Sequence, residues 1–272
     1  MSIKHTLAGL ALAVAALLPA TASTLYGTAY AGLTPLYTLD QSTGALGAVG
    51  ATGATAIGDL TSDTRAGSFT LWGMRIADNE LVTLDAATGA VTSSVALDSN
   101  DDMVSIAFDA VSGRLYGNTS VSFGAAFDAL YEIDPTTGAT SFIGRILFQD
   151  VFALAFDQTG QLFGIADATD ELISISTATG NGALVGSVDV GFAFDIASRP
   201  EDNVMFLSDS GTSSLYRIDT ATGATTLVGP YGSSANIAGL AFGPGAAVPV
   251  PGSLGLAALG LVALGAQVRR RR

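Results

Sequence analysis

The chain has 272 residues, of which 49% are hydrophobic and only 13% are charged. This composition excludes an intrinsically disordered protein and predicts a substantial buried core. The absence of cysteine excludes disulfides and thiol chemistry, and the formal net charge of −13 argues against nucleic acid or anionic lipid as a partner.

Residues 1–22 have the pattern of a secretory signal peptide. Lys4 precedes an apolar run at residues 7–18, and small residues occupy positions 20–22. We predict that signal peptidase cleaves after Ala22 and that the protein is exported. An uncleaved membrane anchor is the alternative, but a run of about 12 apolar residues is too short to span about 30 Å of hydrocarbon as a helix.

Removal of this segment also removes two reactive residue types. The only histidine, His5, and the only lysine, Lys4, both lie in it. The mature chain therefore has no histidine general base, no Ser/His/Asp triad, no histidine-containing zinc site and no lysine for a Schiff base. All 24 acidic residues but only six arginines lie within residues 23–245, which gives this part a formal charge of −18 and favours cations as ligands.

An internal repeat covers residues 23–245. A Thr-Gly pair recurs five times at intervals of 42–49 residues, and a strand-like segment precedes each copy. The alternation of apolar and polar residues predicts strands, and Asp-x-x-Thr-Gly supplies turn residues between them. Four short strands in roughly 45 residues is the period of a propeller blade. The copies are Thr43-Gly44, Thr88-Gly89, Thr137-Gly138, Thr179-Gly180 and Thr222-Gly223.

The two ends of the repeat region complement each other. The region opens with a second-strand segment, Leu25-Tyr26-Gly27, and closes with a first-strand segment, Leu240-Ala241-Phe242. Pairing them would remove the exposed edges of an open array. We therefore predict an all-β, five-bladed β-propeller of four-stranded antiparallel blades, closed by the N- and C-terminal strands. The pattern resembles bacterial repeat propellers whose blades carry Leu-Tyr-Gly and Ile-Asp-x-x-Thr-Gly strands, a resemblance that implies a fold and no activity.

Two sets of recurring residues are predicted to be structural. An aspartate that opens a turn hydrogen-bonds the amides that follow it, so the repeated aspartates are predicted to hold turns rather than to catalyse or bind metal. The repeated aromatic residues are predicted to pack between blades. The aspartates are Asp40, Asp85, Asp134 and Asp219, and the aromatic residues are Tyr26, Trp72, Tyr116, Phe163 and Phe206.

A cation site is predicted at one mouth of the central channel. Asp102, Asp150 and Asn236 each stand four residues before an aligned inner-strand position, and Asp59 and Asp195 lie near the same region in the other two copies. Oxygen ligands of this kind suit a hard cation such as Ca²⁺. The alternative is that these loops are polar because they are solvated. A second acidic loop, residues 98–102, is predicted to be a solvated connection, with calcium binding as its alternative.

Residues 246–272 form a tail with three parts. Pro249 and Pro251 lie in a short proline motif, and an apolar run predicted to be helical follows at residues 254–268. The third part is an arginine cluster, made of Arg269, Arg270, Arg271 and Arg272. Positive charge resists translocation, so the tail is predicted to tether the exported body to the membrane, transiently because the run is short. An ordinary tail anchor is the alternative.

This tail resembles the PEP-CTERM sorting signal through its two prolines, its Gly/Leu/Ala-rich run and its arginine cluster. It departs from that signal at Val250, where the family has glutamate. The resemblance implies handling by an exosortase, a membrane-embedded cysteine peptidase of Gram-negative bacteria that often make exopolysaccharide.

The sequence leaves three functions open. The first is a non-catalytic cell-surface or matrix protein whose propeller is a binding or display scaffold, with exopolysaccharide or surface proteins as partners. The second is an extracellular hydrolase or lactonase-like enzyme that uses carboxylates, with Ca²⁺, at the channel mouth. The third is a sugar-binding module, which would need aromatic residues that the repeat does not use.

Overall fold

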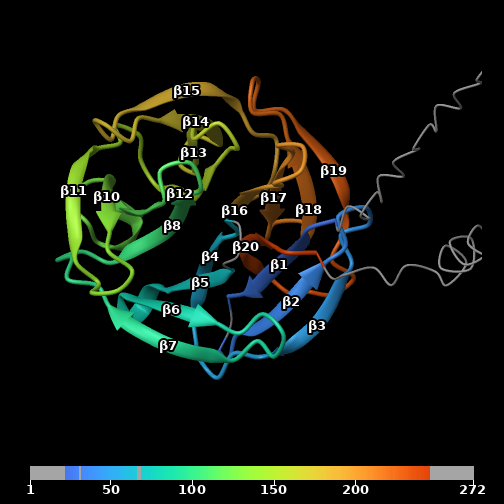
Figure 1. Cartoon of the computed structure of the whole chain (residues 1–272). Helices are drawn as coiled ribbons and strands as arrows, with labels where there is room; N and C mark the ends of the chain where they lie inside the picture. The colour runs from blue at the N-terminus through green and yellow to red at the C-terminus, as the bar shows by residue number, and fades with distance from the viewer. Residues whose placement is uncertain (1–21, 31, 66–68, 246–272) are drawn as a thin grey trace, which may run out of the picture. The chain divides into compact units, whose positions relative to one another are not determined.

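The computed structural model describes residues 22–30, 32–65 and 69–245, which form five four-stranded antiparallel sheets around one axis (Figure 1). We name the sheets blades A to E. From the innermost strand outward they are blade A, β20 (Ile237–Gly243), β1 (Thr24–Ala29), β2 (Pro35–Leu39) and β3 (Leu46–Ala51); blade B, β4 (Ile57–Asp63), β5 (Thr70–Arg75), β6 (Glu80–Leu84) and β7 (Val91–Ala96); blade C, β8 (Met103–Asp109), β9 (Arg114–Thr119), β10 (Ala129–Ile133) and β11 (Thr140–Arg145); blade D, β12 (Val151–Phe156), β13 (Leu162–Ala166), β14 (Glu171–Ile175) and β15 (Gly182–Ser187); and blade E, β16 (Ala193–Ser198), β17 (Met205–Asp209), β18 (Ser214–Ile218) and β19 (Thr225–Pro230). Two 3-10 turns, η1 (Ile76–Asp78) and η2 (Val121–Phe123), complete the described structure. The predicted all-β, five-bladed propeller is confirmed.

Blade A closes the ring. Its β1 pairs with β20 in an antiparallel register that sets Leu25 opposite Phe242 and Gly27 opposite Leu240. These are the two segments that the sequence predicts to share a blade. Because the last strand of the ring completes the same sheet as the first, the two ends of the chain leave no incomplete blade. The ring therefore lacks the terminal edges that an open array would expose.

The repeated aspartates hold the turns between third and fourth strands, as predicted. In blade C, Asp134 Oδ1 accepts the amide of Thr136 at 2.8 Å, and the amide of Gly138 donates to the Asp134 carbonyl at 2.8 Å. Gly138 has a φ of 76°, which a side chain would strain. In blade A the same arrangement lowers the pKa of Asp40 to about 2, mainly through the Ser42 hydroxyl.

The hydrophobic core consists of five clusters, each built from neighbouring blades. Trp72 on β5 packs against Phe108 on β8 with ring centroids 5.4 Å apart, and Phe206 on β17 packs against Phe242 on β20 at 5.7 Å. The repeated aromatic residues are therefore inter-blade packing groups, as predicted. Burying large apolar side chains between blades, rather than within one, makes each blade depend on its neighbours.

The leader at residues 1–21 and the tail at 246–272, with its predicted apolar helix, lie outside the described residues. Within the described part of the chain, no helix has the length and hydrophobicity needed to cross a membrane.

Candidate functional site

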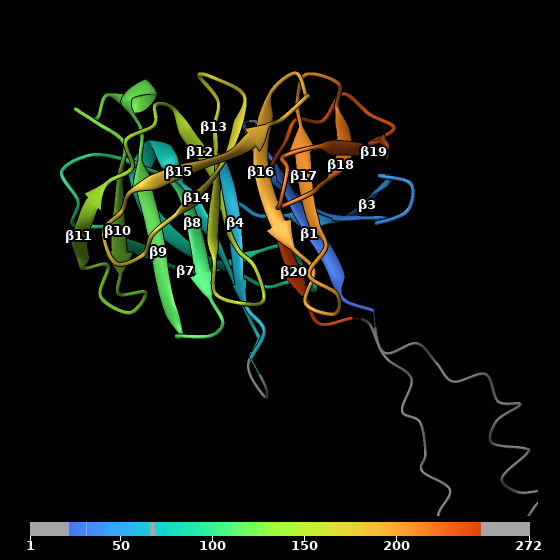
Figure 2. The same ribbon diagram turned by 90° about the horizontal axis from the view of Figure 1, so that it is seen from above.

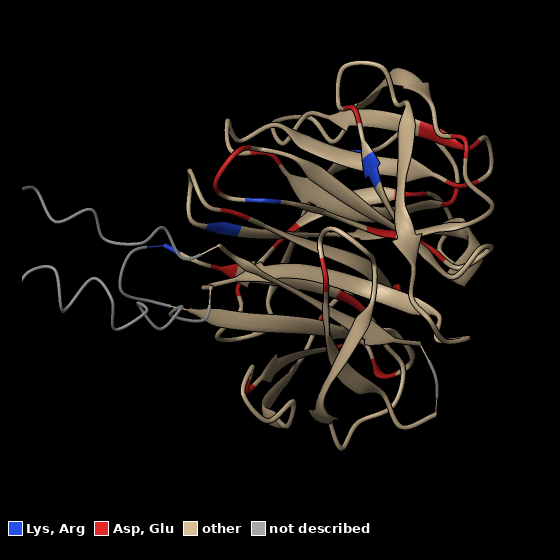
Figure 3. Cartoon of the chain, turned by 90° about the vertical axis from the view of Figure 1, so that its right-hand side faces the viewer, with Lys and Arg blue, Asp and Glu red and all other residues tan. Residues whose placement is uncertain are grey.

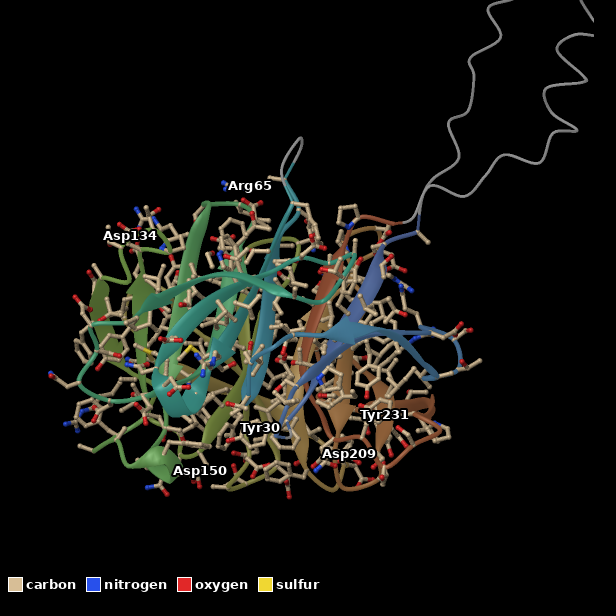
Figure 4. All side chains as sticks on the ribbon, turned by 90° about the horizontal axis from the view of Figure 1, so that it is seen from below. Tyr30, Arg65, Asp134, Asp150, Asp209 and Tyr231 are labelled. Atoms are coloured by element: carbon tan, nitrogen blue, oxygen red, sulfur yellow. The ribbon has the colours of Figure 1, made fainter. Side chains whose placement is uncertain are left out.

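The five inner strands give the ring two distinct faces. β4, β8, β12, β16 and β20 occupy the same position in their blades and run around the axis side by side (Figures 1 and 2). We call the end where these strands begin the upstream face and the end where they finish the downstream face. Figure 4 shows Tyr30, Asp150 and Asp209 at the upstream face, and Arg65 and Asp134 at the opposite end.

The predicted cation ligands all lie at the upstream face. Asp102, Asp150 and Asn236 immediately precede β8, β12 and β20. The equivalent positions of blades B and E carry Ala56 and Phe192, so oxygen ligands occupy three of five places. Asp102 and Asn236 are exposed, and Asp150 is partly buried. No group of three or more Asp, Glu, His or Cys residues placed to hold a metal ion is found within the described residues. The cation site stays a prediction.

Asp150 belongs to a polar cluster that the sequence only partly reveals. Its carboxylate accepts the Ser122 hydroxyl from η2, and its own amide donates to Asp128 Oδ2 at 3.1 Å. The amide of Asp167 donates to the Asp150 carbonyl at 3.0 Å. Burial, followed by the charges of Asp170 and Asp150, raises the pKa of Asp167 to about 6. A carboxyl group with that pKa can exchange a proton near neutral pH.

The other acidic loop is tied into the fold. Asp98 accepts the Thr140 amide at 2.7 Å and the Thr140 hydroxyl at 2.8 Å, which links blades B and C. The Ser99 hydroxyl donates to the Asp101 carbonyl at 2.8 Å. These contacts fit the predicted connecting loop.

The middle of the ring holds two buried carboxyl groups. The third residues of the inner strands are Asp59, Ser105, Ala153, Asp195 and Gly239. We call this level the waist. Asp59 is 1% exposed and Asp195 is 0% exposed. Burial raises the pKa of both groups, and the Asp59 charge raises that of Asp195 further. Neither takes part in any of the five ion pairs within the described residues.

The waist is closed by hydrogen bonds between blades. Asp195 Oδ2 accepts the Leu240 amide at 2.5 Å, and Oδ1 accepts the Ile196 amide at 2.7 Å. The Leu154 amide donates to Ser105 Oγ at 2.9 Å, and Ser105 in turn donates to Asp59. These hydrogen bonds join blade E to blade A, and blade C to blades B and D.

A funnel opens on the downstream side of the waist. This hollow has a cavity volume of about 70 Å³, is open to solvent, and is lined by residues from all five inner strands. Small and hydroxyl side chains form much of its wall, including Thr61, Ser62, Ala155, Ala197 and Ser198. We call it the downstream funnel. This volume is below the roughly 300–1,000 Å³ of typical small-molecule sites, so the funnel has room only for the end of a larger ligand.

The downstream funnel has few ionisable groups. Asp157 is the one ionisable residue among its lining residues in the described part of the chain. The Asp157 carboxylate is occupied within its own turn, where it accepts the Thr159 amide at 2.8 Å and the Gln161 amide at 2.9 Å. Elsewhere the ring carries many acidic residues and few basic ones (Figure 3). The described lining of the funnel therefore has one carboxylate, which is held in its own turn, and no basic side chain.

Sequence reasoning missed both the funnel and the role of the waist. Asp59 and Asp195 were expected near the channel mouth, but they lie inside the inner strands and are buried. The funnel lies at the end opposite to Asp150. The sequence feature that could have indicated the funnel is the small residue that follows the aligned Leu or Ile of the inner strands, as in Leu154-Ala155-Phe156 and Leu240-Ala241-Phe242.

Comparison with known proteins supports the fold. No family model matches the sequence, and no match is found among curated proteins. A chain of a nidogen/laminin complex aligns with a TM-score of 0.58 and 11% identity, over 81% of this chain and 98% of that chain. A gluconolactonase from Xanthomonas campestris aligns with a TM-score of 0.51 and 11% identity, over 84% of this chain and 85% of that chain. At such identities the likeness shows a propeller fold alone.

Proposed function

We propose that this chain is an exported, non-catalytic surface or matrix protein whose propeller binds a ligand in the downstream funnel. The leader pattern at residues 1–22 supports export. The tail, with Pro249, Pro251 and four arginines, supports a transient membrane tether and sorting by an exosortase, as its resemblance to PEP-CTERM signals implies. Recovery of the body in the cytoplasm with its leader attached would contradict this localisation.

The observation that carries the non-catalytic assignment is the chemistry of the funnel. General acid–base catalysis needs a titratable group free to reach the substrate. The only such residue among the lining residues of the described structure, Asp157, is held by amides of its own turn. A concave site without a free acid, base or nucleophile is suited to binding.

The funnel favours an uncharged ligand with many hydroxyl groups. Each inner strand pairs on one side only, so its other edge presents backbone donors and acceptors toward the axis. Ser62 and Ser198 add hydroxyl groups, and no basic side chain lies among the lining residues. The formal charge of −18 over residues 23–245 disfavours an anionic ligand. The end of a neutral polysaccharide chain fits this chemistry.

We expect neutral oligosaccharides to bind the funnel, and the double substitution Ser62→Phe and Ser198→Phe to weaken binding by about tenfold, or about 1.4 kcal/mol. Both serines lie at the inner-strand position where blade D carries Phe156, so the repeat itself accommodates this side chain. The added rings would narrow the hollow. Isothermal titration calorimetry with a panel of neutral oligosaccharides measures the affinity.

Ala183→Phe is the matched control, because Ala183 lies exposed on the outermost strand β15. It should leave the affinity unchanged. Absence of binding to every neutral oligosaccharide, or equal affinity for the double variant and the parent, would refute the funnel as the binding site.

The second candidate function is a carboxylate-dependent hydrolase at the upstream face, with Ca²⁺ held by Asp102, Asp150 and Asn236. The raised pKa of Asp167, about 6, beside Asp150 is the observation that favours it. If this function is correct, lactones or glycosides should be turned over with an activity that Asp167→Asn lowers by about 100-fold. Millimolar Ca²⁺ should then also raise the melting temperature, and Asp150→Asn should abolish that rise. No turnover and no calcium effect would leave the binding scaffold alone.

A further inference from the structure

The waist contains an oxygen atom that the fold leaves without a partner. Asp59 Oδ2 accepts the Ser105 hydroxyl, but Oδ1 is buried and has no hydrogen bond. A buried ionised oxygen without a donor costs several kcal/mol in general, whereas a protonated one can itself donate.

The direction of the surrounding hydrogen bonds is fixed. Ser105 Oγ accepts the Leu154 amide, so its single proton is free to point to Asp59 Oδ2. Oδ2 is therefore the accepting oxygen of Asp59. Any proton on this carboxyl group must be carried by Oδ1.

Asp195 receives more hydrogen-bond donors than Asp59, whose charged form is favoured only by the Ser105 hydroxyl and the Ile106 amide. One of its oxygens accepts the Ile196 amide at 2.7 Å and the other accepts the Leu240 amide at 2.5 Å. The Leu60 amide also favours its charged form. A proton on either oxygen would compete with an N–H donor, so the hydrogen bonds favour an ionised Asp195.

No other charged group at the waist competes for this proton. The remaining waist residues on β8, β12 and β20 are Ser105, Ala153 and Gly239. The residues paired with the waist from the adjoining strands β5, β9, β17 and β1 are neutral. They are Met74, Asn118, Ser208 and Thr28.

We propose that the waist is a binding site for one proton, which Asp59 holds on Oδ1 at neutral pH while the carboxylate of Asp195 stays ionised. The pair then carries one negative charge, and backbone amides of the inner strands stabilise it. The site is separate from the downstream funnel and does not depend on the function proposed for it.

The proposal fixes the direction of a pH effect. In the unfolded chain Asp59 ionises near its ordinary pKa of about 4, whereas the folded protein keeps the proton. The unfolded state therefore binds fewer protons, and the folding equilibrium constant falls as the pH rises above that value. It should fall by about tenfold for each pH unit until the pKa of the folded state is reached.

Asp59→Asn is the decisive variant. Its amide can accept from Ser105 with oxygen and donate with nitrogen where Oδ1 holds the proton, so it mimics the protonated form. We expect urea unfolding between pH 7 and pH 8, above the pKa of about 6 of Asp167, to show the fall in stability for the parent and a nearly flat profile for Asp59→Asn. The variant should be the more stable protein at pH 8. Infrared spectroscopy of the parent at pH 8 should show a protonated carboxyl band that the variant lacks.

Asp109→Asn is the matched control, since Asp109 is also buried, at 7% exposure, but accepts the Val111 amide in a turn at 2.8 Å. It should keep the pH slope and the infrared band of the parent. The proposal fails if the parent has no carboxyl band at pH 8 or no slope. It also fails if calcium or sodium chloride raises the melting temperature of the parent but not of Asp59→Asn, because a cation would then occupy the site.

Discussion

Gly144→Ala is expected to destabilise the ring by about 3 kcal/mol, because the added methyl group has no room between blades C and D. A Cβ atom built on Gly144 would lie 2.0 Å from the carbonyl oxygen of Thr179. That oxygen belongs to the Thr-Gly turn of the next blade, and Gly180 of the same turn approaches the Gly144 backbone in return. Backbone cannot move aside as the end of a side chain can. Urea unfolding measures the loss.

Substitutions at two other glycines serve as controls that distinguish the steric contact of Gly144 from the general effects of replacing a glycine. Gly232 has a φ of 71° with nothing within 4 Å of the added Cβ, so Gly232→Ala should cost only about 1 kcal/mol of conformational strain. Gly32 has open space and no positive φ, so Gly32→Ala should be nearly neutral. Equal stability of Gly144→Ala and Gly32→Ala would show that blades C and D do not meet at this point.

A recurring glycine in the sequence marks this contact between blades, but the turn residues alone do not reveal it. A second glycine follows the Thr-Gly glycine by six residues in four of the five blades, and these glycines are Gly50, Gly144, Gly186 and Gly229. Each would place a Cβ 2.0–2.1 Å from the threonine carbonyl of a neighbouring Thr-Gly turn. Blade B has Val95 at this position. The repeat thus predicted the turn correctly, while the contact between blades needed the curvature of the ring.

The fold could be predicted further than the site, for a physical reason. Strand period, turn residues and the complementary ends are local patterns, and they determine blade number and closure. The depth of a side chain along the channel depends on strand register. Irregular pairing in β4 and β16, between Ile57 and Asp59 and between Ala193 and Asp195, accompanies the placement of both carboxyl groups at the waist. In the sequence the register of these two copies is loose, so Asp59 and Asp195 could be placed only near the mouth.

Asp195→Asn is expected to destabilise the protein by about 3 kcal/mol at every pH, unlike the same change at Asp59. Both oxygens of Asp195 accept backbone amides, from Ile196 and from Leu240. Whichever way the new amide turns, its NH2 group must face an N–H donor. One buried donor then loses its acceptor, and two donors are brought together.

Comparison of three variants tests this assignment. Ser208 Oγ accepts the Asp195 amide at 3.0 Å, so Ser208→Ala removes a neighbouring hydrogen bond at the same depth and should cost only about 1 kcal/mol. Asp195→Asn should be clearly worse than both Ser208→Ala and Asp59→Asn in urea unfolding at pH 7. If Asp195→Asn and Asp59→Asn are equally stable, the two carboxyl groups share one environment and the amides do not distinguish them. A larger loss for Asp195→Asn means that this carboxylate joins blades E and A by accepting backbone N–H groups on both of its oxygens, which a neutral amide of the same shape cannot do.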